Sequence, residues 1–110
     1  MKVWRQGDVL IMEASSIPKD AKLVPNAIEG RIVLAYGEAT GHHHSIAVAD
    51  RDAELLESDT TTDRFLRIMN ASGVELTHQE HATITLPPGD YRVRQQREYV
   101  APEIERKVLD

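Results

Sequence analysis

Short apolar runs separated by turn-forming residues are the feature that most constrains the fold of this chain. Runs such as GDVLIME, RIVLAY and RFLRIM recur along the 110 residues, with Gly, Pro, Asn and Asp between them. Most runs are too short for the three turns of a stable helix, but their length is typical of strands. We therefore expect an all-β fold, either a small barrel or a jelly-roll-like sandwich, with about 7–9 short strands.

The sequence also predicts the local structure of four segments. Residues 51–57 allow one short helix of about two turns. Pro87, Pro88 and Gly89 predict a tight hairpin between ATITL and YRVRQ, because proline cannot donate to a ladder and glycine has a free φ. The arginine-containing strand that follows is expected to be a solvated edge, although its arginines are also suited to clamping a phosphate or carboxylate. The sequence NAS at 70–72 is interpreted as a polar turn between two apolar runs.

Length and charge limit the function classes. We expect one β domain over residues 1–110, because the chain shows no repeat, linker or low-complexity segment. The formal charge is −5 and no basic run occurs, so nucleic acid is not an expected partner. Asp8 and Glu13 interrupt the apolar start, which predicts neither a signal peptide nor a membrane span and favours a cytoplasmic location. The chain has no cysteine, so any metal must be held by nitrogen and oxygen donors.

All five histidines lie in two short segments, GHHH at 41–44 and HQEH at 78–81. Side chains alternate between the two faces of a strand. In the first segment, alternation places His42 and His44 on the face of Ile46 and Val48, and His43 on the other face.

The same alternation, applied to VELTHQEHATITL, places His78 and Glu80 on the face of Leu76. A β-bulge near HQEH reverses this parity and turns His81 inward in place of Glu80. Alternation alone does not decide between these two arrangements.

Imidazoles and a carboxylate facing a core must be paired or coordinated to offset their lost solvation. Three imidazoles and a carboxylate match a divalent Zn, Fe or Mn site in ligand type and number. We expect His42, His44 and His78 to bind one such metal, with Glu80 or His81 completing the site. Glu80 is the candidate general base, and Glu38 is either a partner that orients an imidazole, a ligand itself or a plain turn carboxylate.

Other interpretations of the histidines remain open. They occupy a solvated loop, or His78 is a core histidine bonded to Glu80. Alternatively, the protein is a structural module of a phage or bacterial assembly, or a homo-oligomer, and the histidines lie at a subunit interface around a shared ion. A pH-sensitive patch needs no metal, because histidine titrates near physiological pH. The partner, a small molecule or a protein, is not defined by the sequence.

Two resemblances accompany these residues. His42-x-His44, His78, Glu80 and LPPGDY resemble parts of the cupin pattern, although the glutamate that cupins carry shortly after H-x-H is absent here. GDVL, GEATGHHH, HQEH and PPGDYRVRQQREY also resemble a group of small uncharacterised bacterial and phage proteins. That second resemblance covers most of the chain and implies a compact β fold with a histidine site, without naming a substrate.

Overall fold

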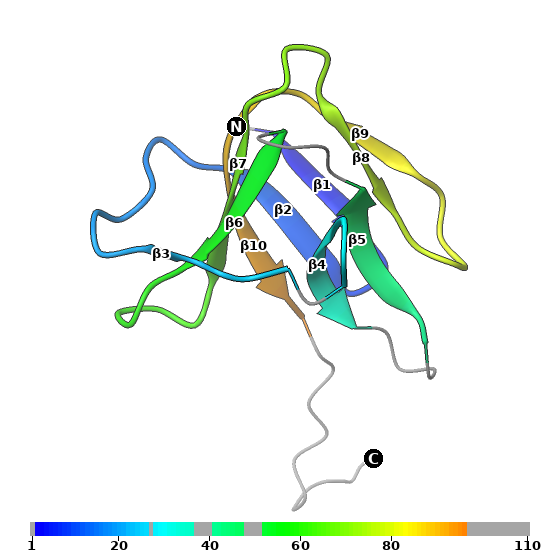
Figure 1. The fold of residues 1–110 in the computed structure, drawn as a ribbon, viewed down its shortest axis with the longest axis horizontal. Helices are drawn as coiled ribbons and strands as arrows, with labels where there is room; N and C mark the ends of the chain where they lie inside the picture. Colours follow the sequence, from blue (N-terminus) through cyan, green and yellow to red (C-terminus); the bar gives the residue numbers. More distant parts are fainter. Residues whose placement is uncertain (1, 27, 37–40, 48–51, 97–110) are drawn as a thin grey trace, which may run out of the picture.

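The fold consists of ten short strands, seen in a computed structural model that describes residues 2–26, 28–36, 41–47 and 52–96 (Figure 1). No helix occurs in these ranges, and hence none that is long and apolar enough to cross a membrane. The strands are β1 (Val3–Gln6), β2 (Val9–Glu13), β3 (Lys22–Leu23), β4 (Arg31–Tyr36), β5 (His43–Ala47), β6 (Ala53–Glu57), β7 (Arg64–Ile68), β8 (Val74–Thr77), β9 (Ile84–Leu86) and β10 (Gly89–Gln95).

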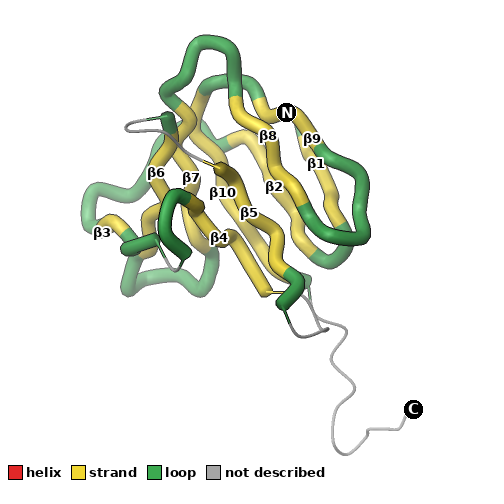
Figure 2. The backbone as a smooth tube through the Cα atoms, turned by 45° about the vertical axis from the view of Figure 1, so that its right-hand side comes forward, coloured by secondary structure: helices red, strands yellow, loops and turns green. Residues whose placement is uncertain are grey.

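The strands form two antiparallel sheets that pack as two layers (Figures 1 and 2). The larger sheet has six strands in the order β1-β2-β10-β7-β6-β3, and the smaller has four in the order β4-β5-β8-β9. No described strand joins the two sheets into a closed barrel. The all-β expectation is therefore confirmed in its sandwich form, with ten strands in place of the expected count.

The core lies between the two layers because alternate residues of each strand point inward. In the larger sheet, Tyr91 pairs in register with Leu66, which pairs with Leu55, and all three are buried. Ile46 and Leu76 pair in the same way in the smaller sheet and are fully buried. One contiguous apolar cluster thus holds both sheets together, which is the property expected of a single domain.

Residues 53–57 form strand β6, so the predicted helix at 51–57 is wrong where the structure describes it. Ala53 and Leu55 are buried and pair in register with Ile68 and Leu66 of β7. An isolated two-turn helix has little stability of its own, whereas the same residues as a strand pair with β7 along their whole length.

The PPG segment links the two sheets and does not form a hairpin. Strand β9 before it belongs to the smaller sheet, and β10 after it belongs to the larger one. The Tyr91 hydroxyl donates a 2.6 Å hydrogen bond to the carbonyl of Pro87, which fixes the bend from inside. The predicted hairpin is wrong because alternation in each strand indicates a buried face without indicating which sheet buries it.

Strand β10 lies between β2 and β7, so the predicted solvated edge is also wrong. Its arginines are held by Asp63, a carboxylate of the same chain that is only 6% exposed. Arg94 donates to both Asp63 oxygens, and the Arg92 guanidinium lies 5.3 Å from the Phe65 ring centre. The hydrogen bonds from Arg94 lower the pKa of Asp63. The bidentate clamp foreseen for these arginines is therefore satisfied internally.

The interpretation of NAS as a turn is confirmed. The Asn70 side chain accepts a hydrogen bond from the Ser72 N–H, and the Asn70 carbonyl accepts one from the Gly73 N–H. This turn carries the chain from β7 in the larger sheet to β8 in the smaller one.

Candidate functional site: a histidine cluster at one end of the sandwich

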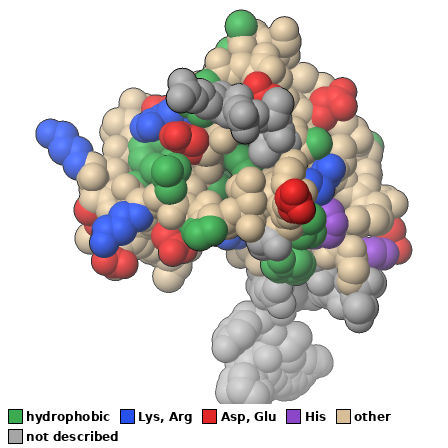
Figure 3. All heavy atoms as spheres, viewed as in Figure 1, with side chains coloured by type: hydrophobic (Ala, Val, Ile, Leu, Met, Phe, Trp, Pro, Cys, Tyr) green, Lys and Arg blue, Asp and Glu red, His purple; other side chains and the backbone are tan. Residues whose placement is uncertain are grey.

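Four of the five histidines come together where the β8–β9 loop meets the start of β5. The ring centres of His44 and His78 are 4.3 Å apart, and those of His78 and His81 are 4.6 Å apart. The His42 ring centre lies 5.6 Å from that of His78. Histidine side chains are visible on one side of the molecule beside acidic ones (Figure 3). The cluster runs from the core to the surface, because His44 is buried, His42 and His78 are half-buried and His81 is exposed.

His44 is the innermost member and is 1% exposed. Its Nδ1 lies 2.9 Å from Oε1 of Gln6, a second buried polar side chain. The Gln6 amide nitrogen donates to the carbonyls of Leu76 and Ala82, at 2.9 Å each. Gln6 thereby connects β1 of the larger sheet to β8 and to the loop that follows it.

This network fixes the tautomer of His44. The two carbonyls require the nitrogen of the Gln6 amide to face them, so its oxygen must face the imidazole. An amide oxygen can only accept, and Nδ1 of His44 must therefore carry the proton. In the neutral ring Nε2 is then left with a free lone pair, which is the form that binds metals or takes up a proton.

The surroundings keep the inner imidazoles neutral. Burial lowers the pKa of His44, and His78 and His81 lower it further, whereas Asp8 opposes the shift. Burial also lowers the pKa of His78, with His81 and His42 adding to the effect. A lowered pKa means that these rings are in the neutral form at neutral pH, with one unprotonated nitrogen that can act as a ligand or a base.

The segment 78–83 is a loop, so the predicted strand alternation fails beyond Thr77. Glu80 is an outer group, with its side chain 68% exposed and Oε2 3.8 Å from Nδ1 of His42. His81, which alternation placed on the far face, contacts His78 and His44. The turn is stabilised locally, because the Glu80 N–H donates to Nδ1 of His78 at 3.0 Å. Alternation applies only while the chain stays extended.

The turn between β1 and β2 brings a residue that the sequence analysis did not select. Asp8 Oδ1 lies 3.4 Å from Nε2 of His44, and its Oδ2 accepts a 2.9 Å hydrogen bond from Gln95. Gly7 adopts a φ of +58°, a conformation that favours glycine. The motif GDVL contains both residues, but only the tertiary structure places them beside the histidines.

His43 lies on the opposite face of β5, as alternation predicts. Its Nδ1 is 2.8 Å from the hydroxyl of Ser45, and its Nε2 is 3.3 Å from the amide nitrogen of Gln79. Because Gln79 accepts from the His43 backbone N–H through its oxygen, its nitrogen donates to the ring, and Nδ1 must donate to Ser45. Ser45 also accepts from Arg31, so His43 is no base for this hydroxyl and the group is a structural network.

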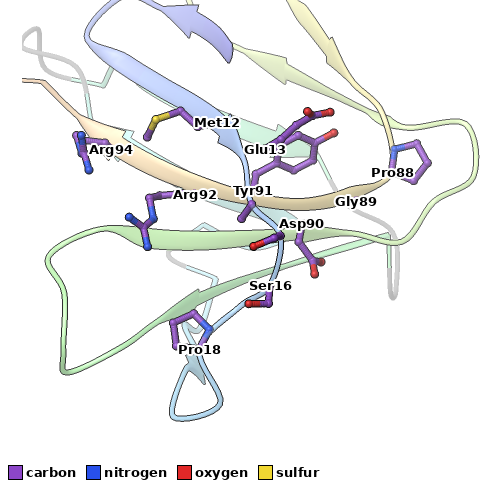
Figure 4. A pocket seen from close by; sticks show the side chains of 12 residues that line it. Met12, Glu13, Ser16, Pro18, Pro88, Gly89, Asp90, Tyr91, Arg92 and Arg94 are labelled. Atoms are coloured by element: carbon purple, nitrogen blue, oxygen red, sulfur yellow. The ribbon is translucent and has the colours of Figure 1, made fainter. Parts of the chain in front are cut away.

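A separate groove of about 850 Å³ lies on the other side of the larger sheet (Figure 4). Met12 and Glu13 of β2, Arg92 and Arg94 of β10, and Ser16 and Pro18 of the β2–β3 loop contribute to its walls. Both arginines already pair with Asp63. The groove contains no histidine and is distinct from the cluster.

Within the described ranges, no three His, Cys, Asp or Glu side chains are arranged as they stand so that they could hold a metal ion. Nδ1 of His78 accepts the Glu80 N–H, so the lone pair of this neutral ring is already used in a hydrogen bond. Glu38, the further sequence candidate, lies outside the described residues.

Comparison with known proteins gives one family. A model described as "Domain of unknown function (DUF8820)" matches residues 5–96. The chain belongs to this family. The DUF8820 match spans both sheets and every residue of the cluster, from Gln6 to His81. No curated protein and no solved structure matches the chain. The family carries no assigned function, so the resemblances to cupins and to small phage and bacterial proteins stay predictions.

Proposed function

We propose that this protein binds one divalent transition metal ion, Zn²⁺, Fe²⁺ or Mn²⁺, through the histidine cluster. His44 is the anchoring ligand, and His42, His78 and His81 supply the further imidazoles. The observation that carries the proposal is the hydrogen bond from Nδ1 of His44 to Gln6. This bond leaves Nε2 of His44 unprotonated, 3.4 Å from a carboxylate oxygen of Asp8. A metal-bound histidine commonly donates its other ring N–H to a protein oxygen in this way.

Metal binding rearranges the outer part of the cluster. His78 uses Nδ1 to accept the Glu80 N–H, so ligation exchanges this hydrogen bond for a metal bond. The 78–81 loop has exposed residues and adjusts without disturbing the core. We infer that the inner ligand is preorganised and that the loop closes over the ion.

The proposed site offers Lewis-acid chemistry to a small molecule that enters from the solvent side. Glu80 stands at this mouth, with an exposed carboxylate next to His42. It is our candidate general base, because an exposed carboxylate reaches a solvent-side substrate more readily than the inner residues do. The substrate is left unassigned.

The direct test is the metal content of protein purified without a nickel column, followed by Co²⁺ titration monitored by absorbance. We expect about one equivalent per chain. Less than about a tenth of an equivalent, with no uptake on titration, contradicts the proposal. A ratio near one ion per two or three chains points to a shared site at a subunit interface instead.

Two neighbouring alanine variants make the test specific. His44→Ala removes the anchoring ligand and should weaken Co²⁺ binding by about ten-fold or more. His43→Ala is the matched control, because this ring lies on the opposite face in the network with Ser45. It should bind Co²⁺ like the wild type, and the reverse order of effects would overturn the assignment.

A further inference from the structure

The turn between β1 and β2 approaches the histidine cluster so closely that no space is left for a Cβ on Gly7. A Cβ placed on Gly7 would lie 2.7 Å from Nε2 of His81 and 3.2 Å from Cε1 of His44. A side chain at position 7 would therefore occupy space that the imidazoles now use. The turn belongs to the larger sheet, whereas His44 and His81 come from the smaller sheet and its loop.

Asp8 is held in a position suited to a ligand. One carboxylate oxygen is fixed by Gln95, which also lies 3.4 Å from the carbonyl of Tyr36. The other oxygen faces Nε2 of His44 at 3.4 Å, and the Asp8 side chain is 34% exposed. The Asp8 carbonyl additionally accepts a 2.7 Å hydrogen bond from the Gln96 N–H. The residue is thus anchored at two points while one oxygen remains directed at the cluster.

Gln6 fixes the orientation of His44, the imidazole that the Asp8 carboxylate faces. Its amide makes hydrogen bonds to His44, Leu76 and Ala82, and these contacts define which way the amide points. Replacing the amide oxygen removes the acceptor of the Nδ1 proton of His44, so the ring is no longer held in the Nδ1-protonated form. Gln6 and Asp8, the residues on either side of Gly7, therefore face the two ring nitrogens of the same imidazole.

We propose that the Gln6-Gly7-Asp8 turn completes the metal centre, with Asp8 as an oxygen ligand and Gln6 as the positioning residue for His44. This inference rests on the proposed function and extends it to a mixed nitrogen and oxygen donor set. A carboxylate donor favours hard or borderline ions such as Mn²⁺, Fe²⁺ and Zn²⁺ over Cu⁺. Because Asp8 and the histidines come from different sheets, the ion links the two layers at this end of the sandwich.

The role of Asp8 is tested with Asp8→Asn, which keeps an acceptor for Gln95 and removes the charge. We expect Co²⁺ affinity to fall about ten-fold or more. Glu75→Gln is the control, because it makes the same charge change at an exposed position of β8. Melting temperatures, measured in chelator, serve to check that both variants are folded. Wild-type affinity in Asp8→Asn overturns the ligand role, whereas failure of the wild type itself to bind Co²⁺ overturns the proposed function and this role together.

The role of Gln6 is tested without metal, by the ¹⁵N chemical shifts of the His44 ring in chelator. We expect the proton on Nδ1 in the wild type and a shift toward the Nε2-protonated form in Gln6→Leu. The wild-type measurement needs no variant to fold, and a proton on Nε2 of His44 overturns the positioning role. This outcome is independent of whether the protein binds a metal.

Discussion

His43 and His44 are adjacent in the chain but lie in different environments. His44 is buried, hydrogen-bonded to Gln6 and surrounded by other imidazoles, whereas His43 takes part in a polar network with Ser45 and Gln79. The residue type is the same, so the difference comes from the face of β5 that each side chain occupies. The chemistry of one histidine in this run therefore says nothing about its neighbour.

The lowered pKa values of His44 and His78 predict that the metal-free protein loses stability in mild acid. The unfolded chain binds protons at the ordinary histidine pKa of 6.5, whereas the folded rings resist protonation until a lower pH. The unfolded state therefore holds more protons in this window, and stability falls as the pH decreases. Thermal melts in chelator should show a falling midpoint between about pH 7 and about pH 5.

His43→Gln is the control for this prediction, because its ring lies outside the inner cluster. His43 contributes least of the neighbouring groups to the lowered pKa of His78, so this variant should keep most of the wild-type pH dependence. A melting temperature that stays flat over the whole window would contradict the prediction.

At the scale of elements, the β1–β2 turn depends on Gly7 for two separate reasons. Its φ of +58° disfavours any other residue, and a Cβ would meet the His81 ring. Gly30 has a φ of +74° with nothing within 4 Å of the corresponding Cβ position. The two glycines therefore separate backbone strain from contact with the cluster.

Gly7→Ala and Gly30→Ala should each lose about 1–2 kcal/mol of stability from the left-handed conformation. Only Gly7→Ala should also displace His81, because that ring is the flexible partner in the clash. Denaturant unfolding measures the shared loss, and Co²⁺ affinity measures the second effect. Equal Co²⁺ affinity in the two variants would show that the turn does not shape the cluster.

The connection from β9 to β10 depends on Tyr91, whose ring is in the core and whose hydroxyl bonds the Pro87 carbonyl. Tyr91→Phe removes this hydrogen bond and keeps the ring, so we expect a loss of about 1 kcal/mol. Tyr36→Phe, at a residue that is 53% exposed, should change stability by less than about 0.5 kcal/mol. Urea titrations of both variants measure the two losses. A similar loss in each would contradict the stabilising role of the Tyr91 hydrogen bond.

At the scale of the whole molecule, the two sheets share one core but meet at the histidine end through polar groups. Gln6 joins β1 to the carbonyls of Leu76 and Ala82, and Asp8 faces His44. A bound ion at this end adds a link between layers that the apolar core does not supply. Its binding free energy appears as folding stability, because the unfolded chain has no assembled site.

Adding metal to the chelated protein should therefore raise the melting temperature. A free ion concentration about 100 times the Kd adds about 2.7 kcal/mol of stability. Calorimetry with and without Zn²⁺ measures this, with His44→Ala as the variant whose stabilisation should be smaller, about 1.4 kcal/mol or less at the same ion concentration if its Kd is about ten-fold or more weaker. An equal shift in that variant would place the binding elsewhere on the molecule.

The sequence by itself determined the fold class and the face of β5 on which each histidine lies. Short alternating runs admit strands and exclude long helices, and Ile46 fixes the face of His44 by parity. Parity is local, so it held for His42, His43 and His44 and failed at Glu80 and His81, where the chain leaves the strand. The sequence also indicated the two histidine segments, because all five histidines lie in them.

Only the tertiary structure decided which strands pair and which polar groups meet. The segments on either side of PPG both alternate, yet they belong to different sheets, because alternation carries no information about the partner. Asp8 and Gln6 reach the cluster across the sandwich, and no local pattern links position 8 to position 44. The pairing of sheets depends on how the whole apolar surface is buried, which is a property of all strands together.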